Sequence, residues 1–277
     1  MTPVQPKPAA SVVLIRPAAR ISDAPSEPTE VYMIRRSSRM RFLGGHYAFP
    51  GGKVEAADAA PESLARCIGL SREAAERILP GSDGLPALAF WVAAIRELFE
   101  ESGVLMASDV TGRSVDPRDR HVAARVERCR KALMTGERSL ADLLAGEGWF
   151  FDPRPLRYLS HFITPPSSPI RFAARFFLSP LPAGQEPRLF SEETSEGFWI
   201  GPCEAYRRFQ AGEMAMAEPA EYTLGYLAQF DSCAAVWANH ADGREKFHGI
   251  LHRIEFYGEG YDWTTATWKA EKPAWLP

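Results

Sequence analysis

One segment, Pro86 to Ser102, constrains the fold more than any other part of the chain. It opens with a proline, is rich in alanine, and is followed by Gly103, which suits a left-handed helix end. These features predict a single long helix. Because residues three and four positions apart share one face of a helix, Glu97, Glu100 and Glu101 are expected to converge on one side of it.

The three glutamates indicate a chemistry for that helix. Carboxylates crowded on one face repel one another, and a cation bound between them relieves the repulsion. Oxygen donors of this kind suit Mg²⁺ or Mn²⁺, ions that activate water and neutralise phosphate groups. The alternative is an acidic helix face that is only solvated, and the three residues by themselves leave both interpretations open.

A glycine-rich segment upstream makes the metal interpretation specific. Residues 49–52 read F-P-G-G, and residues 96–104 read R-E-L-F-E-E-S-G-V. Together they resemble the Nudix box, whose signature is G-x5-E-x7-R-E-U-x-E-E-x-G-U, with U a bulky aliphatic residue. Gly52 opens the box, and its second half matches at every fixed position.

Two features depart from that signature. The acidic residue six places after Gly52 is Asp58, where the family usually has glutamate, so the match at this position is incomplete. Between Asp58 and Arg96 lie 37 residues instead of 7, an insertion of 30. Long surface loops add little closure entropy, so residues 59–88 can form a helical insertion within the box.

The resemblance implies roles for the box residues. In Nudix hydrolases a backbone carbonyl near Gly52 joins the helix glutamates at the metal. This implies that Glu100 and Glu101 ligate divalent cations and that Glu97 is a further ligand or the general base. Arg96 would be their orienting ion-pair partner. Nudix enzymes hydrolyse a diphosphate linked to another moiety, and metal-bound water attacks one phosphorus.

A second pattern occupies residues 32–52. It is similar to the motif L-L-T-x-R-S-x3-R-x3-G-x3-F-P-G-G of coenzyme A diphosphatases, although Y-M-I replaces L-L-T. Coenzyme A (CoA) carries a 3'-phosphate besides its diphosphate, and arginines with serine hydroxyls bind phosphate well. The resemblance implies that the substrate is bound by Arg36, Ser37, Arg41 and Gly51. The alternative is that these arginines only solubilise a strand end.

Residues 171–178 look like the peroxisomal branch of the CoA diphosphatases. Arg171 and Arg175 stand four apart on an expected strand and so share one face. They either contact a substrate phosphate or pair with nearby glutamates. Two of these glutamates, Glu193 and Glu196, lie where Nudix enzymes often carry another acidic residue that faces the metals. The alternative is that they form a solvated acidic turn.

The resemblance also implies the fold. We expect a Nudix α/β/α sandwich, an α/β fold with a mixed central sheet between helices. The insertion adds helices at 59–88, and residues 202–277 are expected to form a mostly helical C-terminal extension. Because no internal repeat or low-complexity linker divides the sequence, we expect one Nudix domain over residues 1–277.

Composition and charge exclude several other classes. Of the 277 residues, 45% are hydrophobic and 24% charged, which excludes a disordered chain and a coiled coil. The net charge of -3 argues against a nucleic-acid partner, and no apolar stretch is long enough to span a membrane. The expected partner is a small-molecule substrate, CoA or a related diphosphate, and a homodimer is a further expectation.

The chain ends and the cysteines indicate a compartment. The first nine residues lack the apolar core of a signal peptide, and the last four, A-W-L-P, are not the peroxisomal address S-K-L. Four cysteines stand far apart without a C-x-x-C pair, which is typical of thiols in a reducing compartment and not of a zinc site. We therefore expect a cytoplasmic enzyme.

Two alternative functions stay open at this point. In the first alternative, the chain hydrolyses another diphosphate, such as NADH, ADP-ribose or a nucleoside diphosphate sugar. In the second, it is a Nudix-fold ligand sensor without catalysis. Sensors usually lose a box glutamate or gain a basic DNA-binding domain. This sequence keeps Glu97, Glu100 and Glu101, which favours an enzyme.

Overall fold

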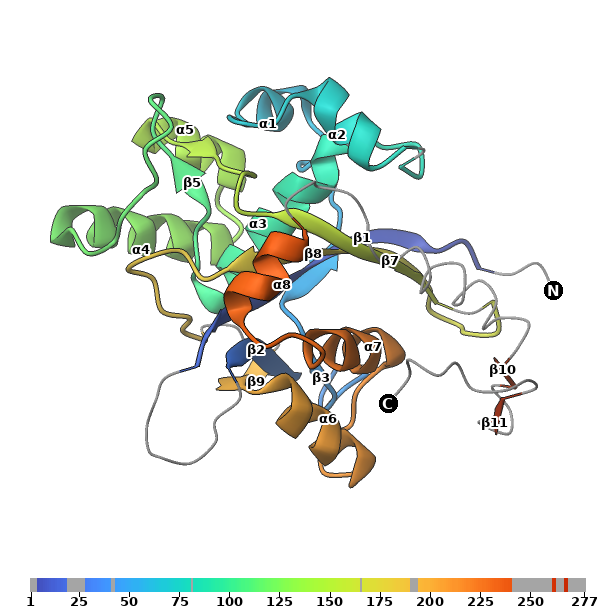
Figure 1. Cartoon of the computed structure of the whole chain (residues 1–277). Coiled ribbons are helices and arrows are strands. Elements are labelled where there is room, and N and C mark those ends of the chain that lie inside the picture. Colours follow the sequence, from blue (N-terminus) through green and yellow to red (C-terminus); the bar gives the residue numbers. More distant parts are fainter. Residues whose placement is uncertain are drawn as a thin grey trace.

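A mixed sheet with helices on both faces forms the centre of the molecule (Figure 1). The computed structural model describes residues 4–18, 28–40, 43–80, 82–164, 166–189 and 194–240, together with the backbone of two short strands at 261–262 and 267–268.

The order of the strands determines where a site can form. The central strand β1 (Lys7–Pro17) pairs in parallel with β8 (Phe172–Pro180) and antiparallel with β2 (Thr29–Arg36) and β4 (Gly51–Lys53). The sheet is extended by three further strands, β3 (Tyr47–Ala48), β7 (Arg157–Ile163) and β9 (Thr194–Ile200). The short strand β4 thus brings the glycine pair next to the central strand.

Side chains that alternate along β1 divide the core into two layers. Val12 and Leu14 are buried on the face covered by α3 (Leu88–Ser102), and Val13 and Ile15 on the opposite face. Both faces are apolar because helices cover both. The opposite face carries α6 (Pro202–Gln210), α7 (Glu218–Leu227) and α8 (Cys233–Asn239). The predicted α/β/α sandwich with a mixed sheet is confirmed.

The insertion folds into two short helices at the beginning of α3. These helices, α1 (Pro61–Ala65) and α2 (Arg72–Ile78), contribute Leu64 and Ala75 to the α3 side of the core. Glu76 accepts a hydrogen bond from the Ala87 amide at 2.8 Å, which satisfies one of the free amides at the start of α3. The insertion is therefore packed against the α3 side of the core and is not a detached loop.

A second group of short elements follows α3. In chain order they are β5 (Ala107–Ser108), α4 (Arg120–Met134), α5 (Leu140–Glu147) and β6 (Phe150–Phe151), and β5 pairs with β6. In the expected C-terminal extension, helices reach Asn239, and the strands β10 (Tyr261–Asp262) and β11 (Thr267–Trp268) pair with each other. None of the helices in the described part of the chain has the length and apolar character needed to cross a membrane.

Candidate active site

Helix α3 presents its acidic residues beside the glycine-rich strand. Leu98 and Phe99 are fully buried, so the helix cannot rotate without exposing them, and this fixes the direction of the glutamates. Gly103 ends the helix with a φ of +74°, a backbone conformation that other residues rarely adopt. The helix predicted from Pro86 begins two residues later, at Leu88, and ends at Ser102 as predicted.

Strand β4 brings the glycine pair against the acidic face of α3. The Gly51 amide donates a hydrogen bond to a Glu101 carboxylate oxygen at 2.8 Å. A Cβ on Gly52 would lie 2.4 Å from a Glu97 carboxylate oxygen, so a side chain at this position would displace Glu97. The close approach of strand and helix thus depends on the glycines.

A buried ion pair joins the two halves of the interrupted box. Arg96 Nε donates to Asp58 Oδ1 at 2.9 Å, and Arg96 Nη2 donates to Asp58 Oδ2 and to the Lys53 carbonyl at 2.8 Å each. The side chains of Arg96 and Asp58 are 7% and 2% exposed. Bidentate pairs of this kind are strong and geometrically specific. Aspartate in place of the usual glutamate therefore still anchors Arg96.

The remaining guanidinium nitrogen of Arg96 faces the glutamates. Its Nη1 lies 2.9 Å from a Glu97 oxygen and 3.3 Å from a Glu100 oxygen. Burial raises the pKa of Glu97 to about 7, the charge of Arg96 opposes this rise, and the charge of Glu100 adds to it. Burial also raises the pKa of Glu100. One arginine is therefore shared among Asp58, Glu97 and Glu100.

This excess of carboxylates over positive charge suits a divalent cation, because Mg²⁺ and Mn²⁺ prefer oxygen ligands. In the described ranges, no three acidic, histidine or cysteine side chains already enclose a metal position. Glu97 contacts Arg96, and Glu101 accepts from the Gly51 amide. The donor set fits a cation, and binding one would exchange some of these contacts for metal ligation.

Arg130, a residue that the sequence analysis missed, supports the end of α3. It is 3% exposed, and its Nη2 donates to the Glu100 carbonyl at 2.9 Å. A Cβ on Gly103 would lie 2.4 Å from Arg130 Nη1, so this glycine also makes room for the guanidinium. The last turn of α3 has no basic residue of its own, and a helix C-terminus favours positive charge. In the sequence, only the four-residue spacing from the apolar Val126 indicates that Arg130 lies on the buried face of its helix.

Comparison with known proteins decides the family. The family model described as the NUDT19 Nudix domain matches residues 6–227. The chain belongs to the Nudix hydrolase family. The putative nudix hydrolase 7 of Caenorhabditis elegans is 30% identical over 77% of this chain. The acyl-coenzyme A diphosphatase NUDT19 of Gallus gallus is 31% identical over 81% of this chain. A solved NUDIX hydrolase from Alicyclobacillus acidocaldarius is 30% identical, with a TM-score of 0.66, over 84% of this chain and 96% of that chain.

These likenesses confirm the family and fold predicted from the box, and they support a Nudix pyrophosphohydrolase as the class of enzyme. Nudix hydrolases generally depend on a divalent metal ion, in agreement with the donor set on α3. The chain spans 61% of the length of the Caenorhabditis elegans relative and 68% of that of the Gallus gallus relative.

The basic segment before the Nudix box lies at the end of β2. Arg36 ends this strand, and its Nε is buried without a hydrogen-bond partner among the described residues. The hydroxyl of Ser37 accepts from the Arg39 amide at 3.4 Å. The Gly45 amide donates to the Arg36 carbonyl at 3.0 Å, which closes the loop toward the glycine pair. Arg41 lies outside the described residues.

Of the two acidic candidates after β8, Glu196 is paired away from the Nudix helix. Glu196 lies on β9 directly opposite Arg35 of β2, and the two side chains form an ion pair at 3.4 Å. Glu193 lies outside the described residues.

The two arginines proposed for substrate binding have separate surroundings. Arg171 precedes β8 and donates to the backbone carbonyls of Thr164 and Val4. Arg175 is buried, and its Nη1 donates to Asp83 of the insertion. Within the described chain neither arginine pairs with a glutamate, and Arg175 instead ties the insertion to the sheet.

Proposed function

We propose that this chain hydrolyses a diphosphate linkage in a small molecule with the help of Mg²⁺ or Mn²⁺. The observation that carries the proposal is the Arg96–Asp58 ion pair, which joins the interrupted Nudix box beside the helix glutamates. The metal would be held by Glu97, Glu100, Glu101 and the Gly52 carbonyl. When bound, it would activate water and offset charge on the reacting phosphate.

The residues of the chain prepare this site in two ways. The Gly51 amide holds Glu101 against the glycine loop, and Arg96 holds Glu97 and Glu100 on the other side. Glu97 then serves as a further ligand or takes the proton of the attacking water. Both roles need an ionised carboxylate, which a nearby cation favours.

We infer that the substrate is CoA or an acyl-CoA. Support comes from the motif around Arg36 and Ser37 and from the likeness to the acyl-CoA diphosphatase of Gallus gallus. The buried Nε of Arg36 supports the same substrate, because it is a donor with no acceptor in the described structure. A phosphate oxygen is a strong acceptor for a guanidinium. The products would be 3',5'-ADP and a phosphopantetheine or its acyl derivative.

A substrate panel tests the reaction first. The purified protein is assayed with Mg²⁺ or Mn²⁺ against CoA, acetyl-CoA, NADH, ADP-ribose and UDP-glucose. We expect release of 3',5'-ADP from CoA or acetyl-CoA at a clearly higher kcat/KM than for the other compounds. Preference for another diphosphate would overturn the CoA assignment and keep the hydrolase, whereas no turnover of any compound would contradict hydrolysis.

The variant Arg36→Gln tests the role of the basic segment. Loss of a charged hydrogen bond to the 3'-phosphate should lower kcat/KM for CoA roughly tenfold or more and change that for ADP-ribose little. Arg39→Gln is the matched control, because Arg39 is an exposed arginine of the same segment. Equal losses on both substrates would contradict a contact between Arg36 and the 3'-phosphate.

A further inference from the structure

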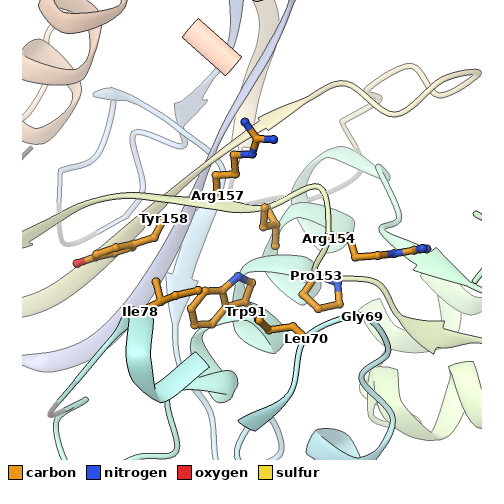
Figure 2. Close-up of a pocket in the computed structure, with 9 residues that line it drawn as sticks. Gly69, Leu70, Ile78, Trp91, Pro153, Arg154, Arg157 and Tyr158 are labelled. Carbon is orange, nitrogen blue, oxygen red and sulfur yellow. The ribbon is translucent and has the colours of Figure 1, made fainter. Parts of the chain in front are cut away.

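The insertion and α3 border a cavity of about 240 Å³ (Figure 2). Its wall is largely apolar and combines the insertion, α3 and the segment that leads into β7, through Leu70, Ile78, Trp91, Pro153, Leu156 and Tyr158. An apolar cavity of about 150 Å³ is enough for a ligand the size of benzene. This cavity is therefore large enough for a short alkyl chain.

Two arginines at the cavity contribute apolar surface and direct their charges elsewhere. The guanidinium of Arg154 donates to Asp152 at 2.6 and 2.7 Å and to the Gly112 carbonyl at 2.6 Å. Arg157 donates to the Trp237 carbonyl and lies over the Trp237 ring. Figure 2 shows both guanidinium groups turned away from Trp91. Their methylene stems line the cavity, as is common for long basic side chains.

One polar group faces this apolar space. Trp91 is 1% exposed, and no described residue accepts a hydrogen bond from its indole N–H. In Figure 2 the indole nitrogen lies on the edge of the ring that faces the loop between Pro153 and Arg157. The N–H is accessible from the cavity, so a molecule bound there can accept a hydrogen bond from it.

We propose that this cavity binds an acyl chain whose carbonyl oxygen accepts a hydrogen bond from the Trp91 indole. An acyl group combines an apolar chain with one acceptor, and the cavity offers an apolar wall with one donor. The chain comes either from an acyl-CoA, in which case the inference rests on the proposed function, or from a free fatty acid.

The cavity lies within reach of the carboxylate site. Trp91 precedes Glu97 by six residues of the same helix, about 9 Å along its axis. Because β4, β1, β8 and β7 are successive neighbours, Gly52 and Tyr158 are three strand spacings apart across the sheet and offset by two residues along it, together roughly 16 Å. The pantetheine arm contains two amide units and is about as long as four or five extended residues, roughly 15 Å. Its length thus matches the separation.

Binding to the full chain, measured by isothermal titration calorimetry in EDTA so that nothing is hydrolysed, tests the proposal. The three probes are CoA, octanoyl-CoA and octanoate. Ile78→Trp fills the cavity from the side of the insertion. Val110→Trp adds the same side chain at a position that is 70% exposed and does not line the cavity. Trp91→Phe keeps an aromatic ring and removes the N–H donor.

We expect Ile78→Trp to weaken binding of octanoyl-CoA or octanoate at least about tenfold and Trp91→Phe about threefold or more, with Val110→Trp close to wild type. If octanoyl-CoA binds more tightly than CoA and Ile78→Trp removes that advantage, the occupant is the acyl group of the substrate.

The remaining outcomes separate this inference from the proposed function. If octanoate binds in the wild type but not in Ile78→Trp, and neither CoA compound binds, the cavity takes a free fatty acid. The CoA assignment is then decided by the substrate panel with Mg²⁺, because without a metal the glutamates repel the diphosphate. If Ile78→Trp leaves the affinities unchanged, or if neither octanoyl-CoA nor octanoate binds, the acyl site is overturned.

Discussion

The Nudix box and the basic segment before it are both rich in charge, but the charges are used differently. In the box, Arg96 makes contacts of 2.8 to 2.9 Å with Asp58 and Glu97, and the side chains of Arg96 and Asp58 are almost entirely buried. In the basic segment, Arg35 makes an exposed pair at 3.4 Å, and Arg36 keeps a buried Nε without a described acceptor.

This difference indicates that the two regions contribute to binding in different ways. The box is organised by contacts within the chain before any ligand arrives, so its glutamates are already in place. The basic segment keeps hydrogen-bonding capacity that a ligand can use. Four predictions test how far this contrast holds.

The largest effect is expected from Asp58→Asn, which removes one charge from the bidentate pair with Arg96. Leaving one partner of a buried ion pair uncompensated costs about 3–5 kcal/mol of unfolding free energy. Because Glu97 and Glu100 still contact Arg96, we expect a loss near the lower end of this range. Urea unfolding measures this loss. Asp116→Asn is the control, because Asp116 forms an exposed pair with Arg118 and its loss should change stability little. Similar small changes in both variants would show that the box is not organised by this pair.

Glu101→Gln separates chemistry from folding in the same region. Glutamine can still accept from the Gly51 amide, so the melting temperature should stay close to that of the wild type. One metal-binding charge is lost, and kcat with Mg²⁺ should fall by more than about 100-fold, beyond the loss typical of outer-shell partners of a metal. Full activity in this variant would place the metal on other residues.

Arg130→Met tests whether the organisation of the box extends to α4. Loss of the contact to the Glu100 carbonyl should lower kcat/KM and raise the Mg²⁺ concentration for half-saturation, each about tenfold. Arg128→Met, an exposed change on the same helix, should alter neither value.

A double-mutant cycle tests the contact between Gly103 and Arg130. Gly103→Ala should cost less stability in the Arg130→Met background, because the added Cβ then no longer meets the guanidinium. Additive costs would speak against this role of Gly103.

The smallest effect concerns pH. The pKa of Glu97 is raised by burial to about 7, above its value of about 4.3 in an unfolded chain. Its contribution to stability is therefore complete below about pH 4.3 and is lost as the pH rises through 7. In EDTA, the unfolding free energy should fall more steeply with rising pH in the wild type than in Glu97→Gln between pH 5 and 8. Saturating Mg²⁺ should remove this difference, and equal slopes in EDTA would contradict the shift.

The parts of the molecule that follow from local spacing could be predicted from the sequence. A helix from Pro86 to Ser102 was expected, and α3 is found at Leu88–Ser102, because its apolar pattern and Gly103 act within a few residues. The placement of Glu97, Glu100 and Glu101 on one side follows from helical geometry. The mixed sheet and its helices followed from the resemblance of the box to a known family.

Contacts between distant segments could not be predicted in the same way. Arg171 and Arg175 are expected from their spacing to share one face of a strand, but Arg171 lies before β8, and the partner of Arg175 is Asp83, which lies 92 residues away in the chain. Likewise, Arg130 meets Glu100 and Gly103 only because α4 packs beside α3. No spacing rule connects such residues, since the tertiary fold alone brings them together.

The two neighbouring glycines of β4 would behave differently in a library of all single substitutions. A Cβ on Gly51 would lie 2.5 Å from the Ala10 carbonyl oxygen, which belongs to the backbone of the central strand and cannot move aside. For a Cβ on Gly52, the three nearest atoms all belong to the Glu97 side chain, which can swing away. Variants at position 51 should therefore be depleted from the folded pool, whereas variants at position 52 should stay abundant and inactive. Of two adjacent glycines in one motif, the first would thus be required for folding and the second for activity.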